Sequence, residues 1–303
     1  MQSSPFVMII FGATGDLSRN KLMPALFSLF KQRQMSGQFF IVGFARRPFT
    51  DEEFRVMMSE SLLSGDETEV RNFFKSIYYQ QGLFDQQKGY DELINKLNSF
   101  DQKMGACITR LFYLATPPDN YETILNFLHD TKLSEGRKHG SSKWTRLIIE
   151  KPFGKDIETA RSLDKKLAKV FEEKQIFRVD HYLGKETVQN ILTFRFANGI
   201  FEPIWNKKYI DHIQLTWAET KGIGGRGKFF DGVGLLRDVG QNHLMQLIAA
   251  VAMEQPRSFS REGVRDARAK AIKAIRFIES SEVQKFVVRG QYGGYKEEKD
   301  VKK

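Results

Sequence analysis

The sequence has 303 residues and only one cysteine, Cys107. A single thiol can form no internal disulfide and cannot supply a thiolate cluster for zinc. Because Cys107 lies in an apolar stretch before Leu111, we expect a small buried hydrophobe rather than a nucleophile. No apolar run approaches the roughly 20 residues of a membrane span, and the N-terminus shows no basic-then-apolar export signal. We therefore expect a cytoplasmic protein without a membrane partner.

Acidic residues are in the minority, with 37 Asp and Glu against 47 Lys and Arg, for a net charge of +10. The basic residues are scattered, and no long basic tract is interleaved with aromatic residues. This pattern favours a solvated basic surface over a nucleic-acid partner. With 41% hydrophobic residues, a chain of this length can bury a sizeable core and form two domains.

Histidine is also scarce, with five residues available for acid–base chemistry. His129 and His139 lie in a polar stretch and are expected to face solvent, while His212 lies in a predicted strand and is expected to be packed. His181 and His243 lie among polar residues at an element end and on a helix. These two are the candidates for chemistry, and no metal site is expected.

The first part of the chain alternates short apolar runs with stretches of helical periodicity. Strands are predicted at residues 6–11, 39–44, 108–115, 146–150 and 175–180, and helices at 17–30, 51–63, 121–128 and 157–171, with Thr50 as an N-cap. Alternation of this kind predicts an α/β fold with a parallel, doubly wound sheet of the Rossmann type over residues 1–178.

The regular alternation of strands and helices ends before the remaining residues, 179–303. Helices are predicted at 186–196 and 232–253, strands at 210–219 and 283–289, and a glycine-rich loop at 222–227. We therefore expect a second, α+β domain.

The segment GATGDL, residues 12–17, joins the first predicted strand to its helix. Small residues there let the backbone approach a pyrophosphate, although the G-x-x-G spacing also suits a plain tight turn. Arg46 follows the second strand, where an NAD site usually has an acidic residue. Its guanidinium suits a 2′-phosphate, and a solvated loop arginine is the alternative.

The segment DHYLGKE, residues 180–186, combines a carboxylate, a histidine and a lysine. A helix starting near His181 would place His181 and Lys185 on one face, as a phosphate site. The alternative is Asp180 capping an ordinary exposed helical turn.

RVDHYLGKE, from Arg178, closely resembles the substrate signature of glucose-6-phosphate dehydrogenases. Further blocks follow in the family's order: GATGDLSRNKL, VGFARR, YLATPP, EKPFG and RGKFFDGVGLLRDVGQNHLMQ. The resemblance covers essentially the entire chain. It implies an NADP-dependent oxidation of glucose 6-phosphate at C1 by a Rossmann-type domain and a substrate and dimerisation domain.

The resemblance also implies a role for each matching position. The catalytic base would be His243, oriented by Asp180. The substrate-binding residues would be Lys151, His181, Tyr182, Lys185, Glu219 and Asp238. The cofactor-binding residues would be Gly12, Thr14, Gly15, Asp16, Leu17, Lys21, Arg46, Pro117, Pro118 and Lys151, with a cis Lys151–Pro152 bond. Oxidation at C1 releases a hydride while the O1 proton is taken up, which suits an imidazole base beside a carboxylate.

Two features depart from the family pattern. Gly240 is expected to interrupt the helix beside His243 and to loosen that residue. Family members also continue further, so the expected antiparallel sheet and the family's dimer surface would be incomplete. Two alternatives therefore remain: a module that binds NADP and sugar phosphate with weak or no activity, and another sugar oxidoreductase with an EKP motif.

Overall fold

The computed structural model describes residues 5–35, 38–62, 66–135, 145–154 and 156–302. His139 lies outside these residues. The chain divides into two compact units, Met1–Val179 and Asp180–Lys303, and each is described by itself.

The first unit is built on a six-stranded parallel sheet in the order β3-β2-β1-β4-β5-β6. The strands are β1 (Phe6–Phe11), β2 (Phe39–Ala45), β3 (Ile77–Gln81), β4 (Thr109–Leu114), β5 (Thr145–Glu150) and β6 (Ile176–Val179). The predicted parallel, doubly wound sheet is confirmed, and β3 is a strand that the sequence analysis did not identify.

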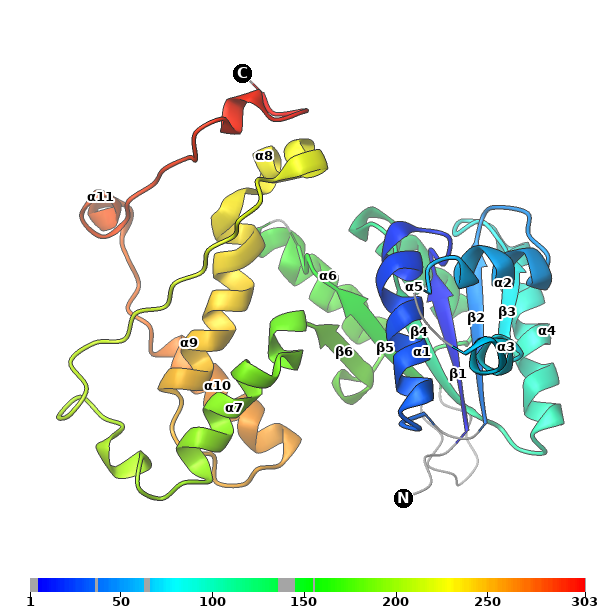
Figure 1. Ribbon diagram of the computed structural model, residues 1–303, viewed down its shortest axis with the longest axis horizontal. Coiled ribbons are helices and arrows are strands. Elements are labelled where there is room, and N and C mark those ends of the chain that lie inside the picture. The colour runs from blue at the N-terminus through cyan, green and yellow to red at the C-terminus, as the bar shows by residue number, and fades with distance from the viewer. Residues whose placement is uncertain (1–4, 36–37, 63–65, 136–144, 155, 303) are drawn as a thin grey trace. The chain divides into compact units, whose positions relative to one another are not determined.

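Helices cover both faces of this sheet (Figure 1). One face carries α1 (Met23–Lys31), α2 (Asp51–Ser59) and α3 (Glu67–Phe74), and the other carries α4 (Gln87–Lys103), α5 (Tyr121–Asp130) and α6 (Ile157–Val170). Strands buried on both sides need apolar residues at every position, which explains the continuous runs in β1 and β2.

The expected N-cap of α2 is present as a reciprocal capping box. The Thr50 hydroxyl accepts from Glu53 N at 3.2 Å, and Thr50 N donates to the Glu53 carboxylate at 2.7 Å. These bonds satisfy two backbone donors, and they lower the pKa of Glu53.

The order of strands reverses direction at β1, which lies between β2 and β4. Phe11 at the end of β1 pairs in register with Phe44 on one side and Leu114 on the other. In open α/β sheets ligands bind at the carboxyl ends of the strands beside such a switch point. Residues that follow these three strands therefore share the edge where a cofactor is expected.

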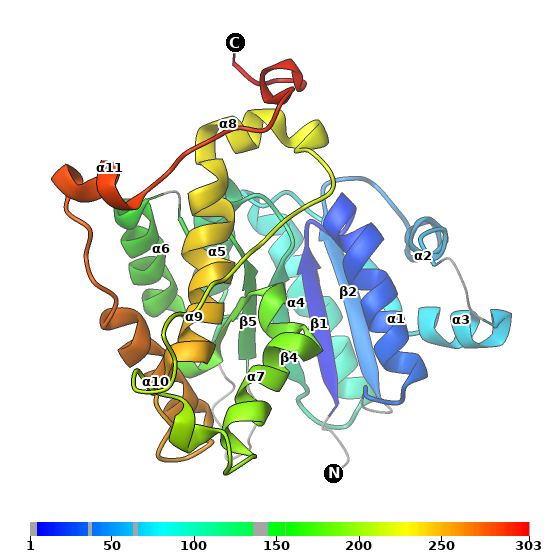
Figure 2. The same ribbon diagram turned by 60° about the vertical axis from the view of Figure 1, so that its left-hand side comes forward.

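The second unit is helical in its described part (Figure 2). Its helices are α7 (Glu186–Phe196), α8 (Gly227–Leu235), a π-helix (Leu236–Leu244), α9 (Met245–Ala252), α10 (Arg261–Lys273) and α11 (Val283–Phe286). α9 packs against both α7 and α10. Arg195 of α7, almost fully buried, donates to the carbonyls of Ala250 and Val251 at the end of α9.

Short helical segments complete the two units. Five-residue π-helical geometry covers Ser18–Leu22, and 3₁₀ turns cover Pro118–Asn120, Glu173–Gln175, His181–Gly184, Glu202–Ile204, Gly224–Arg226, Ser280–Glu282 and Tyr295–Glu297. Within the described parts of the chain, no helix is both long and apolar enough to cross a membrane.

The predicted antiparallel sheet of the second unit is wrong for the residues that the structure describes. The predicted strand 210–219 is extended but has no partner strand, and the predicted strand 283–289 is the short helix α11 with an extended end. A strand is stable only when a neighbour satisfies its backbone groups, so apolar alternation alone does not make a sheet.

We expect the turn after β1 to tolerate no side chain at Gly12. Its φ is +84°, and a Cβ there would lie 2.5 Å from the Ala115 carbonyl oxygen. Gly12→Ala should therefore lower the free energy of unfolding by about 2–4 kcal/mol, measured by urea denaturation. The control is Gly105→Ala, which also has a positive φ, +60°, but open space around it. Equal losses in the two variants would contradict the steric explanation.

Candidate active site

The imidazole of His243 lies against the carboxylate of Asp180 in the second unit. His243 Nδ1 is 2.6 Å from Asp180 Oδ1, and the side chains are 2% and 11% exposed. His243 lies on the π-helix, and Asp180 follows β6. An ionised carboxylate can only accept, so the imidazole donates through Nδ1 and leaves Nε2 as its basic atom when neutral.

The same oxygen of Asp180 also fixes the turn that follows it. Tyr182 N donates to Asp180 Oδ1 at 3.0 Å, which makes Asp180 the N-cap of the 3₁₀ turn His181–Gly184. The position of the carboxylate is therefore set by the local backbone before His243 reaches it.

The turn brings three predicted substrate residues to His243. The Tyr182 ring stacks on His243 with centroids 4.3 Å apart and planes 18° apart, and the His181 ring lies edge-on at 4.6 Å from His243. Lys185 Nζ lies 3.7 Å from the centroid of Tyr182. The structure thus places His181, Tyr182 and Lys185 in one cluster with the dyad.

The helical spacing predicted for His181 and Lys185 is wrong. The turn ends at Gly184, and Lys185 is extended, with φ −73° and ψ 130°, as the N-cap of α7. The two side chains meet through the Tyr182 ring instead. The cause is Asp180, which caps a short turn rather than a continuous helix.

Asp238 lies one π-helical turn before His243 and is 8% exposed. Its carboxylate is 3.6 Å from Arg226 Nη1. Backbone bonding from i to i+5 places Asp238 on the same side of the segment as His243. Glu219 is exposed in the extended segment, and among the described residues no hydrogen bond or ion pair joins it to the cluster.

The interruption expected at Gly240 is not observed. The π-helix continues through Gly240, and the backbone departs from helical geometry at Gly234, with φ 73° and ψ 166°. The wider π turn accommodates Gly240 and keeps His243 on a regular segment.

Two other histidines can be compared with their predictions. His129 is 61% exposed, as expected for a solvent-facing residue. His212 is 76% exposed and bonds to Asp211 at 2.8 Å, so its predicted packing in a strand is wrong because that strand does not form.

Two residues near the dyad were missed from the sequence. Trp217 donates its indole N–H to the Tyr182 hydroxyl, and Arg268 of α10 interacts electrostatically with Asp180. Burial lowers the pKa of Arg268, and the Asp180 carboxylate opposes that shift. Trp217 could have been found from the apolar alternation of Leu215 and Trp217 in the sequence, and both residues are half-buried. Arg268 carries no such signal.

Asp180, His181 and His243 each have one ligand-type atom, and these atoms lie within 4.8 Å of one another. The hydrogen bond between Asp180 and His243 already uses one oxygen and one nitrogen of this group. The cluster thus contains a hydrogen-bonded pair with a neighbouring histidine.

In the first unit, the glycine turn lies at the carboxyl edge of the sheet. Gly12 N donates to the Phe44 carbonyl at 2.9 Å, and the Gly12 carbonyl accepts from Gly15 N at 3.0 Å and from the Ser18 hydroxyl at 3.2 Å. Helical backbone begins at Asp16, so its first N–H groups lie next to this turn. Thr14 and Leu17 are half-buried beside it.

The remaining cofactor candidates of this unit lie after neighbouring strands. Arg46 is exposed directly after β2, and Pro117 and Pro118 follow β4 at the start of a 3₁₀ turn. Asp16 and Lys21 are exposed on the first helix. Anion-binding backbone and a guanidinium at one sheet edge fit a dinucleotide that carries an extra phosphate.

Lys151 follows β5 at the same edge, and its peptide bond to Pro152 is cis, as expected. The preceding Glu150 is fixed by Tyr113, whose hydroxyl donates to its carboxylate at 2.5 Å, and by Tyr121, which donates to its carbonyl at 3.3 Å. Burial and the bond to Glu150 raise the pKa of Tyr113, and burial raises the pKa of Tyr121 to about 12. Both phenols are thus neutral donors.

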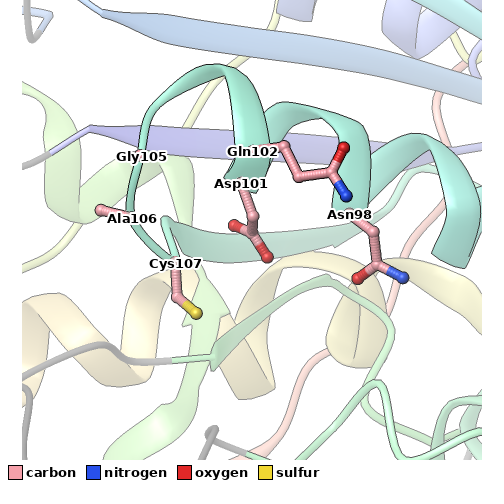
Figure 3. Close-up of a pocket in the computed structure, with 6 residues that line it drawn as sticks. All are labelled: Asn98, Asp101, Gln102, Gly105, Ala106 and Cys107. Atoms are coloured by element: carbon pink, nitrogen blue, oxygen red, sulfur yellow. The ribbon is translucent and has the colours of Figure 1, made fainter.

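A separate pocket of about 410 Å³ lies at the end of α4, before β4 (Figure 3). It is lined by Asn98, Asp101, Gln102, Gly105, Ala106 and Cys107. Cys107 is half-buried in its wall rather than in the core, so the predicted burial is wrong. The Asp101 carboxylate accepts hydrogen bonds from Ile108 N at 2.8 Å and from the Arg110 guanidinium at 3.2 Å. Because the pocket precedes β4, it lies at the amino edge of the sheet, away from the cofactor residues.

Comparison with known proteins identifies the family. The model of the glucose-6-phosphate dehydrogenase NAD binding domain matches residues 9–190, and that of the C-terminal domain of the same enzyme matches residues 192–303. The chain belongs to the glucose-6-phosphate dehydrogenase family.

Relatives in the family resemble the whole chain. Glucose-6-phosphate 1-dehydrogenase of Chlamydia muridarum is 45% identical over 98% of the chain, which covers 61% of that relative. The enzyme of Bacillus subtilis is 40% identical over 96% of the chain, which covers 58% of that relative. The chain therefore spans about three fifths of the length of these relatives.

Solved structures of glucose-6-phosphate dehydrogenases share the fold. One, in complex with its substrate glucose-6-phosphate, has a TM-score of 0.90 and 36% identity, with all of this chain and 64% of that chain covered. The enzyme from Mycobacterium avium has a TM-score of 0.85 and 34% identity over 99% of this chain and 63% of its own.

We expect the buried pair to fix the tautomer of His243. In ¹⁵N-histidine spectra the neutral ring should carry its proton on Nδ1, and Asp180→Asn should remove that preference because a carboxamide can donate as well as accept. The internal control is His212, whose Asp211 partner is 98% exposed and should impose no tautomer. An unchanged His243 tautomer in Asp180→Asn would contradict the assignment.

Proposed function

We propose that this protein oxidises glucose 6-phosphate at C1, transfers the hydride to NADP and forms 6-phosphogluconolactone. The observation that carries the proposal is the buried bond from His243 to Asp180 at 2.6 Å, with His181, Tyr182 and Lys185 beside it. A hydroxyl is oxidised here to a carbonyl, so the site needs a base for the O1 proton and a charge complement for the phosphate.

In this mechanism His243 Nε2 accepts the O1 proton as the C1–O1 double bond forms and the C1 hydride leaves. Bound NADP supplies the hydride acceptor. Asp180 holds the ring through Nδ1–H and stabilises the imidazolium, because their opposite charges lie in a site with little exposed surface. The first unit would thus supply the cofactor site, and the second unit the base.

The substrate phosphate would bind at Lys185, His181 and the Tyr182 hydroxyl. The phosphate dianion would be bound by the Lys185 ammonium and by the N–H and O–H donors of His181 and Tyr182. Binding of the phosphate, which is remote from the reacting carbon, helps to orient C1. Asp238, Glu219 and Lys151 would bind further oxygen atoms of the substrate, and Lys151 would also contact the cofactor.

NADP would bind at the glycine turn of the first unit. A Cβ at Gly12 would meet the Ala115 carbonyl, so the turn allows close approach of the backbone. The pyrophosphate would lie at Gly12, Thr14, Gly15, Asp16 and Leu17, the 2′-phosphate at Arg46, and the nicotinamide end near Lys21. Pro117 and Pro118 would shape the wall of the cofactor site. A cytoplasmic location and a homodimer remain predictions.

His243→Asn should reduce kcat for glucose 6-phosphate by about 10²–10⁴-fold, because the proton acceptor is lost. NADPH formation is followed optically, and the control is His212→Asn, which removes an exposed histidine. NADP binding by the wild type without turnover would favour the alternative of a binding module. Turnover of free glucose alone would exclude the phosphate site.

Arg46→Ala should weaken NADP binding by about 10–100-fold, which is the affinity lost with one charge-assisted hydrogen bond. NAD binding should be unchanged, because NAD has no 2′-phosphate. The measurement is isothermal titration with each dinucleotide. Arg47→Ala is the matched control, because Arg47 is the neighbouring exposed arginine. Equal weakening of NADP and NAD would show that Arg46 does not read the 2′-phosphate.

A further inference from the structure

Trp217 donates its indole N–H to the hydroxyl oxygen of Tyr182. Trp217 is half-buried in the extended stretch 210–219, which pairs with no strand among the described residues. Tyr182 is 8% exposed in the turn after Asp180. A side-chain bond, rather than a sheet ladder, thus joins this stretch to the turn.

The direction of this bond follows from the chemistry of the two groups. An indole N–H can only donate, so the Tyr182 oxygen must accept. The phenol has a single proton, which is then directed away from Trp217. Accepting one hydrogen bond also polarises the O–H group and strengthens its next donation.

The groups around Tyr182 favour an anion as the acceptor of that proton. Lys185 Nζ lies 3.7 Å from the ring centroid, and the ring is stacked on His243, so the phenol cannot turn without losing both contacts. The His181 ring lies 4.9 Å away, edge-on. A hydroxyl donor beside an ammonium and an imidazole suits a phosphate monoester.

We propose that Trp217 is a positioning residue that makes the Tyr182 hydroxyl a one-way donor to the substrate phosphate. It thereby contributes to the preference for a phosphorylated over a free sugar. The proposal rests on the proposed function, and it adds a residue to which the resemblance gave no role.

The first test is Trp217→Phe, which keeps an aromatic ring and removes the N–H. We expect KM for glucose 6-phosphate to rise about 3- to 10-fold, as for one lost hydrogen bond, with kcat and the kinetics on free glucose little changed. Trp205→Phe is the matched control, because Trp205 donates its N–H to the Val251 carbonyl in the same unit. It should leave the ratio of KM values for the two sugars unchanged.

A double-mutant cycle with Tyr182→Phe separates positioning from anchoring of the stretch. If Trp217 acts through the Tyr182 hydroxyl, adding Trp217→Phe to Tyr182→Phe should raise KM for glucose 6-phosphate little further. Additive losses, or equal rises in KM for both sugars, would overturn the proposal, because Trp217 would then only anchor the segment.

The second test begins with the wild-type protein. The sequence contains three tryptophans, whose indole N–H groups give separate ¹⁵N–¹H resonances. Addition of inorganic phosphate to the wild-type protein should shift the Trp217 resonance and not that of Trp205, and Tyr182→Phe should abolish the shift. A Trp217 resonance that phosphate does not move would overturn the proposal.

The two tests distinguish this proposal from the proposed function. Without turnover of glucose 6-phosphate the proposed function fails, while a phosphate-induced shift that depends on Tyr182 would still support the role of Trp217. Turnover with no such shift would retain the function and reject Trp217 as its positioning residue.

Discussion

One carboxylate oxygen, Asp180 Oδ1, holds the candidate active site together. It accepts from Tyr182 N in its own turn and from the imidazole of His243, which lies 63 residues further along the chain. The first bond sets the 3₁₀ turn, and the second satisfies a nitrogen that would otherwise be buried without a partner. Removal of this oxygen would therefore disturb the backbone that carries His181 and Lys185 as well as the position of His243.

The π-helix is the second constraint, because it determines which side chains lie on the same side as His243. In an α-helix, with 3.6 residues per turn, positions five apart lie roughly 140° apart around the axis. In the π-helix Leu236–Leu244 each backbone hydrogen bond spans this interval and the turn is wider, so Asp238 and His243, both buried, lie on the same side. Widening the helix thus places a carboxylate and an imidazole on one side of the segment, where regular geometry would separate them.

The elements that periodicity and capping patterns predicted, and that the structure confirms, have local causes. β1 and β2 are continuous apolar runs because both faces of a parallel sheet are covered, and Thr50 caps α2 through a residue three positions away. The strand expected at 210–219 depended on a distant partner, which alternation does not reveal. The prediction that His181 and Lys185 lie on one helical face was wrong because Asp180 caps a short turn. The π-helix was not predicted, because it leaves no periodic signal in the sequence.

The extended stretch that carries Trp217 shows how a site can be ordered without a sheet. Leu215 and Trp217 are half-buried and lie two residues apart, as expected for one face of an extended chain. A tyrosine or glutamine at position 217 could both donate and accept, and the Tyr182 proton could then point either way. An indole has no acceptor atom, so it fixes the direction of that proton. Orienting a donor before an anion arrives lowers the reorganisation that binding requires.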